Sequence, residues 1–423
     1  MKTEILTVGT EILLGQIIDS NSSYIAQELL ANGIDLYGVS TVGDNLYRIV
    51  DAIRYSLSKC DALIVTGGLG PTQDDITRNA VAMVMGVDLV ENKYLKDLIS
   101  KFFADRNRPM PENNLLQAMV PEGAEFIEQK LGTAPGLICP VGNKVIYCLP
   151  GVPYEMKEML NRSVIPDILG KAQLTKHMKF VTVATWGLSE SRVAELLSDE
   201  FNRLESMQKE GREYIPSIAF LANISTGIKI RVSLSGEDEI KVNEILRDEV
   251  DRVASVLGES VFSTDSETLE QVIHRICTEK SITIGLVESL TGGMIASRIV
   301  DVPGASKYFK GSIVAYDTEI KRSILKIQAS EVVSEAAVIE MAKSGLELLT
   351  CDICLSISGV GGPEKQEGKD PGTVYIGLAA DTAKFSKVNL NPVELKLYGS
   401  RDTIRQMATT SALDLLRRRL THF

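Results

Sequence analysis

The first residue that could perform chemistry is a serine in the run Ile284-Gly-Leu-Val-Glu-Ser-Leu-Thr-Gly-Gly-Met294. An apolar segment ends at Glu288-Ser289, and two glycines then open an amphipathic segment, which predicts a strand, a sharp turn and a helix. A hydroxyl at such a turn lies beside unpaired backbone N–H groups and the positive end of a helix dipole. Ser289 is therefore a candidate nucleophile, and the alternative is a serine that only caps the helix.

A serine nucleophile needs a neighbouring group that takes its proton. The chain has three histidines, and His422 at its end is a poor partner for Ser289. Thr318 is the predicted N-cap of a helix, which places Lys321 in the first helical turn, where the dipole lowers a lysine pKa. A neutral amine there can act as general base, with the Tyr316 hydroxyl as proton relay. The alternative for the lysine is an exposed side chain on the helix surface.

Two further residues lie at the predicted ends of elements in the same part of the chain. Ser358 stands at the rim of a second strand and glycine-rich turn, Leu355-Ser-Ile-Ser-Gly-Val-Gly-Gly-Pro363. Arg401 opens the last predicted helix, and a guanidinium in that position can clamp a phosphate.

A separate glycine-rich segment follows the predicted buried strand Ala62–Val65: Thr66-Gly-Gly-Leu-Gly-Pro-Thr72, then Gln73-Asp-Asp75. Such a turn feeding a helix N-terminus offers free N–H groups to a phosphate. The two aspartates have the wrong sign for phosphate unless a divalent cation bridges them. The alternative is a tight turn in which an aspartate caps the helix.

Strands and helices alternate along the chain, which predicts an α/β fold with parallel sheets that bind ligands beyond the carboxyl ends of their strands. Length and pattern changes predict an α/β domain over residues 1–170, a small α+β module over 171–260 and an α/β domain over 261–423. We expect the middle module to act as spacer and subunit contact.

Bulk properties exclude several classes of protein. A net charge of −11 among 423 residues disfavours direct nucleic-acid binding. No apolar run approaches the roughly 20 residues of a membrane span, and the first residues do not resemble a signal peptide. Six scattered cysteines suggest reduced thiols in the cytoplasm. The Cys351-x-x-Cys354 spacing falls in an apolar run and is interpreted as strand rather than as a metal site.

The N-terminal glycine-rich segment, with Val8-Gly-Thr-Glu-Ile-Leu13 and Leu149-Pro-Gly-Val-Pro153, resembles the molybdopterin-binding (MoaB/MogA-like) domain, in the version found at the N-terminus of CinA proteins. The resemblance implies a three-layer α/β/α domain over residues 1–170 with a nucleotide- or pterin-phosphate pocket. In some relatives this domain is an ADP-ribose pyrophosphatase that needs a divalent metal. The residues implied at the phosphates are Gly67, Gly68, Gly70 and Thr72. Those implied at the metal are Asp75, Asp74 and Glu11, with Asp19 nearby and Glu155 as a weaker candidate.

The C-terminal motifs Glu288-Ser-x-Thr-Gly-Gly293, Tyr316-x-x-x-x-Lys321, Ser358-Gly-x-x-Gly-Pro363 and Arg401-Asp resemble the CinA C-terminal domain, also called PncC. Members hydrolyse nicotinamide mononucleotide (NMN) to nicotinate mononucleotide and ammonia. The resemblance implies Ser289 as nucleophile, Lys321 as its base and Tyr316 as proton-transfer partner, with no metal or other cofactor. It further implies an oxyanion hole of N–H groups around Thr291, Gly292 and Gly293, with Ser358 on the substrate and Arg401 on its phosphate.

The sequence is compatible with three functions. The first is an NMN amidase in pyridine-nucleotide salvage, and the second is an ADP-ribose pyrophosphatase in the N-terminal domain, which can coexist with the first. The third is a non-enzymatic protein linked to competence or DNA damage. For each we expect small-molecule nucleotides rather than nucleic acid or membrane as partners, and a cytoplasmic homodimer.

Overall fold

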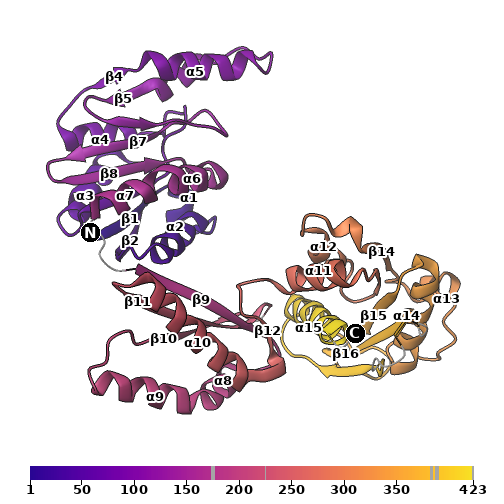
Figure 1. Cartoon of the computed structure of the whole chain (residues 1–423). Coiled ribbons are helices and arrows are strands. Elements are labelled where there is room, and N and C mark those ends of the chain that lie inside the picture. Colours follow the sequence, from indigo (N-terminus) through magenta and orange to yellow (C-terminus); the bar gives the residue numbers. More distant parts are fainter. Residues whose placement is uncertain (173–176, 224, 382–383, 386–389, 422–423) are drawn as a thin grey trace. The chain divides into compact units, whose positions relative to one another are not determined.

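The computed structural model describes residues 1–172, 177–223, 225–381, 384–385 and 390–421, so His422 lies outside the described residues. Contacts divide the chain into two compact units (Figure 1). The first comprises Met1–Lys179 with Ser235–Val242, and the second comprises Phe180–Leu234 with Asn243–Phe423. Most of the segment over 171–260 therefore groups with the C-terminal part of the chain.

The first unit is built on a six-stranded sheet of order β2-β1-β3-β8-β7-β6. Four strands are parallel: β2 (Leu36–Val42), β1 (Thr3–Val8), β3 (Ala62–Thr66) and β8 (Lys144–Leu149). Two antiparallel strands complete the sheet: β7 (Gly136–Val141) and β6 (Glu125–Ile127). A separate two-stranded ribbon pairs β4 (Leu89–Glu91) with β5 (Met119–Pro121).

Helices cover both faces of this sheet, because successive strand residues point to opposite sides. Leu6, Leu63 and Ile146 pack on one side against helices α3 (Leu46–Leu57), α4 (Thr77–Met85) and α5 (Lys93–Ala104). Their neighbours Ile5 and Ile64 pack on the other side with α2 (Ser20–Ala31), α6 (Pro153–Met159) and α7 (Ile165–Ala172). The short helix α1 (Thr10–Leu13) follows β1. The three-layer α/β/α arrangement predicted for this part is confirmed.

The second unit contains most of a four-stranded sheet of order β10-β11-β9-β12. Its strands are β9 (His177–Thr185), β10 (Ser217–Asn223), β11 (Gly227–Gly236) and β12 (Val261–Ser263). Three helices accompany them: α8 (Glu190–Leu196), α9 (Ser198–Lys209) and α10 (Glu239–Leu257).

The C-terminal sheet of the second unit has the order β14-β13-β15-β16-β17. Its strands are β13 (Ile284–Glu288), β14 (Phe309–Val314), β15 (Ile353–Gly359), β16 (Thr373–Ala380) and β17 (Val393–Lys396). The strands β14, β13 and β15 are parallel, so their carboxyl ends meet at one edge. The strand β16 runs antiparallel to both of its neighbours, β15 and β17.

Helices again lie on both faces of the C-terminal sheet. One side packs against α11 (Leu269–Lys280), α12 (Met294–Val300) and α15 (Arg401–Thr421). The other faces α14 (Glu335–Leu349), and the short α13 (Thr318–Ser323) follows β14. Among the described residues, the structure contains no helix with the length and apolar character needed to cross a membrane.

Candidate functional site

The turn after β13 carries Ser289 and is fixed between the two neighbouring parallel strands. The N–H of Ser289 donates to the Ile357 carbonyl at 3.1 Å, and the N–H of Ala315 donates to the Glu288 carbonyl at 2.8 Å. Ser289 is 7% exposed, and no hydrogen-bond partner holds its hydroxyl among the described residues. The serine therefore lies at the carboxyl edge of the sheet, where parallel sheets bind ligands.

Glu288, which our sequence analysis did not consider as a functional residue, is fully buried under this turn. Its carboxylate accepts from the N–H groups of Gly293 at 3.0 Å, Ile295 at 3.1 Å and Ala296 at 3.0 Å, and from the Ser312 hydroxyl at 3.1 Å. The carboxylate thus satisfies the unpaired N–H groups at the start of α12 and complements the helix dipole. The position of a glutamate at the end of an apolar strand, directly before a helix, is the sequence feature that could have indicated this capping role.

These bonds correct the predicted oxyanion hole. The N–H of Gly292 donates to the Ser289 carbonyl at 3.0 Å, and the N–H of Gly293 donates to the buried carboxylate. Neither N–H is free for a ligand in this arrangement. The N–H groups of Leu290 and Thr291 have no acceptor among the described residues, and the buried Thr291 hydroxyl is also unpartnered. These donors remain as candidates beside the serine.

Arg405 of α15 holds the same turn from outside, and the sequence analysis missed it. Its Nε donates to the Leu290 carbonyl and its Nη2 to the Thr291 carbonyl, both at 3.0 Å. With their carbonyls bound on one side, the peptide units of the turn have fixed orientations. Arg405 stands one helical turn after Arg401, and that spacing could have indicated it.

Lys321 is buried, with 2% of its surface exposed. The helix begins after Asp317, whose carboxylate accepts from the Glu319 N–H at 2.7 Å, so Asp317 rather than Thr318 is the N-cap. Lys321 consequently lies one position farther from the helix start than we predicted, and the dipole argument weakens. Burial instead lowers the pKa of Lys321, against the opposing effects of Asp317 and Glu367. The ammonium forms no ion pair with the described residues and donates to the Tyr316 carbonyl at 3.1 Å.

Tyr316 and Arg401 are brought together although 85 residues separate them. A guanidinium nitrogen of Arg401 donates to the Tyr316 hydroxyl, and another donates to the Gly362 carbonyl at 2.6 Å. Tyr316 is 56% exposed, and its hydroxyl acts as the acceptor in the bond from Arg401. Arg401 thus links the turn after β14 to the glycine-rich turn after β15.

Ser358 is placed differently from the expectation of direct substrate contact. It is 1% exposed and its hydroxyl donates to the Val332 carbonyl at 2.7 Å. Its proton is therefore engaged within the protein, and only a lone pair of the oxygen is left for other donors.

The glycine-rich segment of the first unit lies beside the segment that follows β8. The N–H of Gly67 donates to the Leu149 carbonyl at 3.0 Å. The side-chain amide of Asn21 donates to the Thr66 hydroxyl at 3.1 Å and to the Gly151 carbonyl at 2.8 Å. Its own oxygen is buried and has no hydrogen-bond partner in the described part of the chain. The carboxyl ends of β3 and β8 therefore share one edge with the start of α2.

The glycine at position 67 is required by backbone geometry. It has φ of 104°, and a Cβ there would lie 2.2 Å from the Val8 carbonyl oxygen. Gly68 has φ of 67°, and Gly70 packs against Asp75. Arg78 of α4, which the sequence analysis missed, donates to the carbonyls of Leu69 and Gly70 and is 2% exposed. Burial lowers the pKa of Arg78 to about 10.

The carboxylates predicted to hold a metal do not form a ligand set. Asp75 accepts from the Thr72 N–H at 2.8 Å and from the Thr72 hydroxyl at 2.6 Å, which makes it part of the turn. Asp74 and Glu11 are exposed. Within the described ranges, no three His, Cys, Asp or Glu side chains gather as metal ligands require, so the residues present do not fit a protein-held metal.

Glu155 and Asp19 are two other acids near this edge. Glu155 lies in the first turn of α6 with 8% exposure, and burial raises the pKa of its carboxyl. Asp19 is the N-cap of α2 and accepts from Ser22 and Thr7. Burial of Asp19 is outweighed by these hydrogen bonds, which hold its pKa below the ordinary value.

Comparison with known proteins places both parts of the chain. Residues 266–420 match the family model described as "CinA C-terminal domain", and residues 4–170 match "Probable molybdopterin binding domain". A CinA-like protein of Frankia casuarinae is 36% identical over 99% of this chain and 96% of its own. A CinA-like protein of Dictyoglomus thermophilum is 37% identical over 99% of both chains.

A crystal structure of CinA from Thermoplasma acidophilum is 36% identical, covers 40% of this chain and 97% of its own, and has a TM-score of 0.37. The identity and coverage of the full-length relatives settle the classification, and this chain belongs to the CinA family.

Proposed function

We propose that the C-terminal domain is an amidase that hydrolyses the carboxamide of NMN, with Ser289 as nucleophile and Lys321 as general base. The observation that carries the proposal is the state of Lys321. Its amine is buried without an ion pair to the described residues, and burial lowers its pKa. A lysine held in this way is suited to accept a proton from a serine hydroxyl.

In the acylation step, Ser289 Oγ attacks the carboxamide carbon while its proton passes to the neutral Lys321 amine. The carbonyl oxygen becomes an oxyanion, for which the free N–H groups of Leu290 and Thr291 are the available donors. Collapse of this intermediate breaks the C–N bond, and Lys321 or the Tyr316 hydroxyl returns a proton to the leaving ammonia. The product of this step is an ester between Ser289 and the nicotinate carbonyl.

Water then attacks the ester carbon, and Lys321 takes the proton of that water. Breaking the ester bond returns a proton to Ser289 and releases nicotinate mononucleotide. The Arg401 guanidinium lies at the same edge of the sheet and is the proposed partner of the substrate phosphate. Binding the phosphate there exchanges its present bonds to Tyr316 and Gly362 for bonds to the ligand.

The direct test is ammonia release from NMN by the full chain. Ser289→Ala is expected to lower kcat by roughly 10⁴-fold or more, because it removes the nucleophile and leaves the rest of the site intact. Ser297→Ala, on the exposed side of α12, is the matched control and is expected to be fully active. Undiminished hydrolysis by Ser289→Ala would refute the assignment.

A second candidate function is hydrolysis of the ADP-ribose pyrophosphate by the N-terminal domain. The observation that favours it is Glu155, a buried acid with a raised pKa near the glycine-rich edge. A carboxyl of this kind is suited to proton transfer at a phosphate ester. Because the acids in the described part of the chain do not form a metal ligand set, we assign no step to a metal.

This second function is tested by separating products of ADP-ribose after incubation with the full chain. Glu155→Gln is expected to slow cleavage strongly, and Asp75→Asn is expected to slow it by disturbing the turn at Thr72. Cleavage unchanged by either substitution, or absent under all ionic conditions, removes the proposal. Inactivity on both NMN and ADP-ribose would favour the non-enzymatic alternative.

A further inference from the structure

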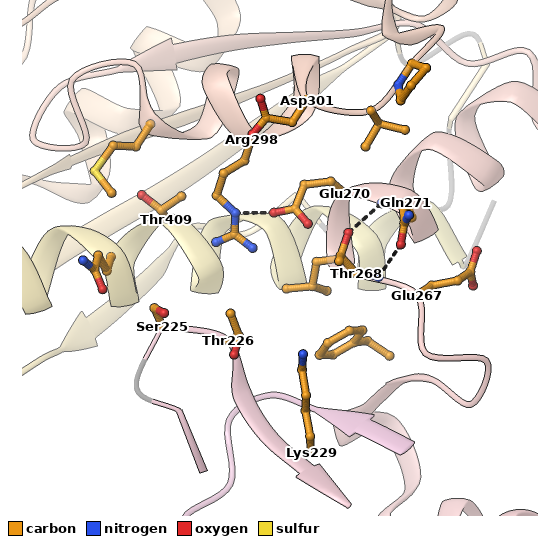
Figure 2. A pocket seen from close by; sticks show the side chains of 16 residues that line it. Ser225, Thr226, Lys229, Glu267, Thr268, Glu270, Gln271, Arg298, Asp301 and Thr409 are labelled. Atoms are coloured by element: carbon orange, nitrogen blue, oxygen red, sulfur yellow. Dashed lines mark hydrogen bonds and ion pairs between the residues drawn. The ribbon is translucent and has the colours of Figure 1, made fainter. Parts of the chain in front are cut away.

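A cavity of about 600 Å³ lies within the second unit, between the start of β11 and the helices α11, α12 and α15 (Figure 2). This volume falls in the range of small-molecule sites, roughly 300–1,000 Å³. Ser289, Lys321, Tyr316 and Arg401 do not line it. The cavity is therefore distinct from the proposed amidase site.

Two cationic side chains enter this cavity from opposite walls. Figure 2 shows Lys229 extending from β11 and Arg298 from α12 toward the same space. Arg298 is partly neutralised, because it donates to the Glu270 carboxylate and to the Thr410 hydroxyl, the latter at 2.7 Å. Lys229 has no hydrogen-bond or ion-pair partner among the described residues. A ligand anion between the two would supply the missing negative charge.

Two of the acids that line the cavity already have cationic partners, which leaves Lys229 as the cation without a counter-charge among the described residues. Glu267 is engaged in a 3.0 Å ion pair with Arg275, and Glu270 is committed to Arg298. Asp301 is exposed, directly after the last residue of α12. A carboxylate in such a place accepts hydrogen bonds from sugar hydroxyls, as acids in nucleotide sites do.

Apolar side chains complete the lining. Phe262, Leu269 and Met294 contribute to the wall, and Phe262 is 8% exposed. Aromatic and thioether groups provide flat, polarisable contact surface for a ring system. The cavity thus offers three environments that differ in chemistry: a cationic pair, an acidic rim and an apolar wall.

From this combination we propose that the cavity binds a nucleoside monophosphate. Its phosphate lies between Lys229 and Arg298, its sugar hydroxyls face Asp301, and its base lies against Phe262 and Met294.

The position of the cavity connects this ligand with the serine turn. Met294 directly follows Gly293, whose N–H is held by Glu288. Thr409 donates to the Arg405 carbonyl at 2.8 Å, and Arg405 holds the carbonyls of the turn. A bound nucleotide therefore contacts both helices that fix the turn, and we expect it to change the NMN hydrolysis rate. This last consequence rests on the proposed amidase function.

Binding itself is tested without any activity measurement, by labelling the methionine methyl groups of the full chain with carbon-13 for NMR. The chain has 12 methionines, and the Met294→Leu variant identifies the Met294 signal. Adenosine monophosphate is expected to shift this signal in a saturable way, whereas adenosine at equal concentration leaves it in place. An unmoved Met294 signal with adenosine monophosphate overturns the proposal, and an equal shift with adenosine overturns the role of the cationic pair.

Lys229→Met is the decisive variant, because removing an unpartnered side chain leaves other contacts intact. It is expected to weaken the Met294 response to adenosine monophosphate by on the order of tenfold or more. Lys343→Met, an exposed lysine of α14, is the control and is expected to respond as the wild type. A response in Lys229→Met identical to wild type places the nucleotide elsewhere and overturns the site. Thermal unfolding of both variants confirms that each is folded, and failure of the amidase alone leaves these results unaffected.

Discussion

The Lys321 ammonium donates to the carbonyl oxygen of Tyr316 at 3.1 Å, five residues earlier in the chain. This bond fixes the lysine against the turn after β14, while the Tyr316 hydroxyl is held by Arg401 on the other side of the same residue. Tyr316 therefore positions the proposed base through its backbone and offers a proton through its side chain.

Replacing Lys321 with methionine is expected to abolish amidase activity and to stabilise the fold at neutral pH. The folded-state pKa of Lys321 lies below its ordinary value of 10.5, so the unfolded chain binds more protons between these two values. Wild-type stability consequently rises with pH across that window. The gain in stability from Lys321→Met is expected to be largest at neutral pH and to vanish near pH 10.5. Urea unfolding at several pH values measures it, and a destabilised variant at pH 7 would contradict it.

The pH profile of kcat/KM is expected to report the protonation of the Lys321 amine. Activity is expected to rise with pH as Lys321 loses its proton, with an inflection below 10.5 because burial lowers the pKa. Lys321→Arg is expected to be inactive at every pH, because a guanidinium does not lose its proton. An active arginine variant would show that another group takes the serine proton.

Glu288→Gln tests the buried acceptor under the serine turn. The amide retains one acceptor oxygen but directs an NH₂ group toward backbone N–H donors, which leaves buried donors unsatisfied. We expect a loss of about 1–3 kcal/mol in the free energy of unfolding and a lower kcat with little change in KM. Glu335→Gln, in the exposed first turn of α14, serves as control. A Glu288 variant with wild-type stability would show that the carboxylate is dispensable.

Arg405→Met tests whether the turn is held from α15. Losing the bonds to Leu290 and Thr291 frees their carbonyls, so the N–H groups of the turn lose their fixed direction. We expect kcat to fall by roughly 10²-fold, the size of losing one oxyanion donor, with substrate affinity nearly unchanged. Arg401→Met, in contrast, is expected to raise KM. If both variants changed only KM, Arg405 would be a binding residue.

A fifth prediction concerns the buried Glu249 of α10. Burial and the neighbouring Glu200 carboxyl raise the pKa of Glu249 to about 7, although Arg203 partly opposes them. The folded state therefore binds more protons between pH 4.5 and 7, and this residue reduces stability as the pH rises. Glu249→Gln is expected to stabilise the protein by about 1–3 kcal/mol at pH 8 and little at pH 4.5.

The matched control is Glu200→Gln. Burial of Glu200 is outweighed by its bonds to Arg203 and Glu249, so its pKa is lowered and its charge stabilises the fold above its unfolded pKa. The control is expected to lose stability at pH 8. If both variants changed the free energy of unfolding in the same direction at pH 8, the assignment of the raised pKa to Glu249 would be contradicted.

The sequence predicts the sheets well because short continuous apolar runs and glycine-rich turns are local signals. The strand before Ser289 and the parallel edge that joins it to Tyr316 follow from such patterns. The cap of α13 was wrong by one residue, because Asp317 and Thr318 are adjacent and both can cap a helix. Capping propensity alone does not decide which of two adjacent residues caps the helix when both have a suitable side chain.

The bonding partners of the site's supporting residues could not be predicted for a different reason. Arg405 lies 115 positions from the Leu290 carbonyl that it holds, and the partners of Glu288 include Ser312 on another strand. Such bonds depend on how the helices pack on the sheet, and the spacing of residues in the sequence does not reveal that packing. The N–H groups of Gly292 and Gly293 were predicted to bind an oxyanion because the sequence does not show which acceptors they have in the fold.

The contacts of helix α15 determine where the chain can be cut to give a folded C-terminal fragment. Its Thr410 hydroxyl donates to the Ser225 carbonyl, and its Arg417 guanidinium donates to the carbonyls of Glu259 and Val261. All three acceptors precede residue 266, where the match to the C-terminal family model begins. A fragment cut at that boundary loses acceptors for two buried side chains of its longest helix. An expression fragment of this half of the chain is better started before Phe180, and weak activity in a shorter one would reflect a damaged helix.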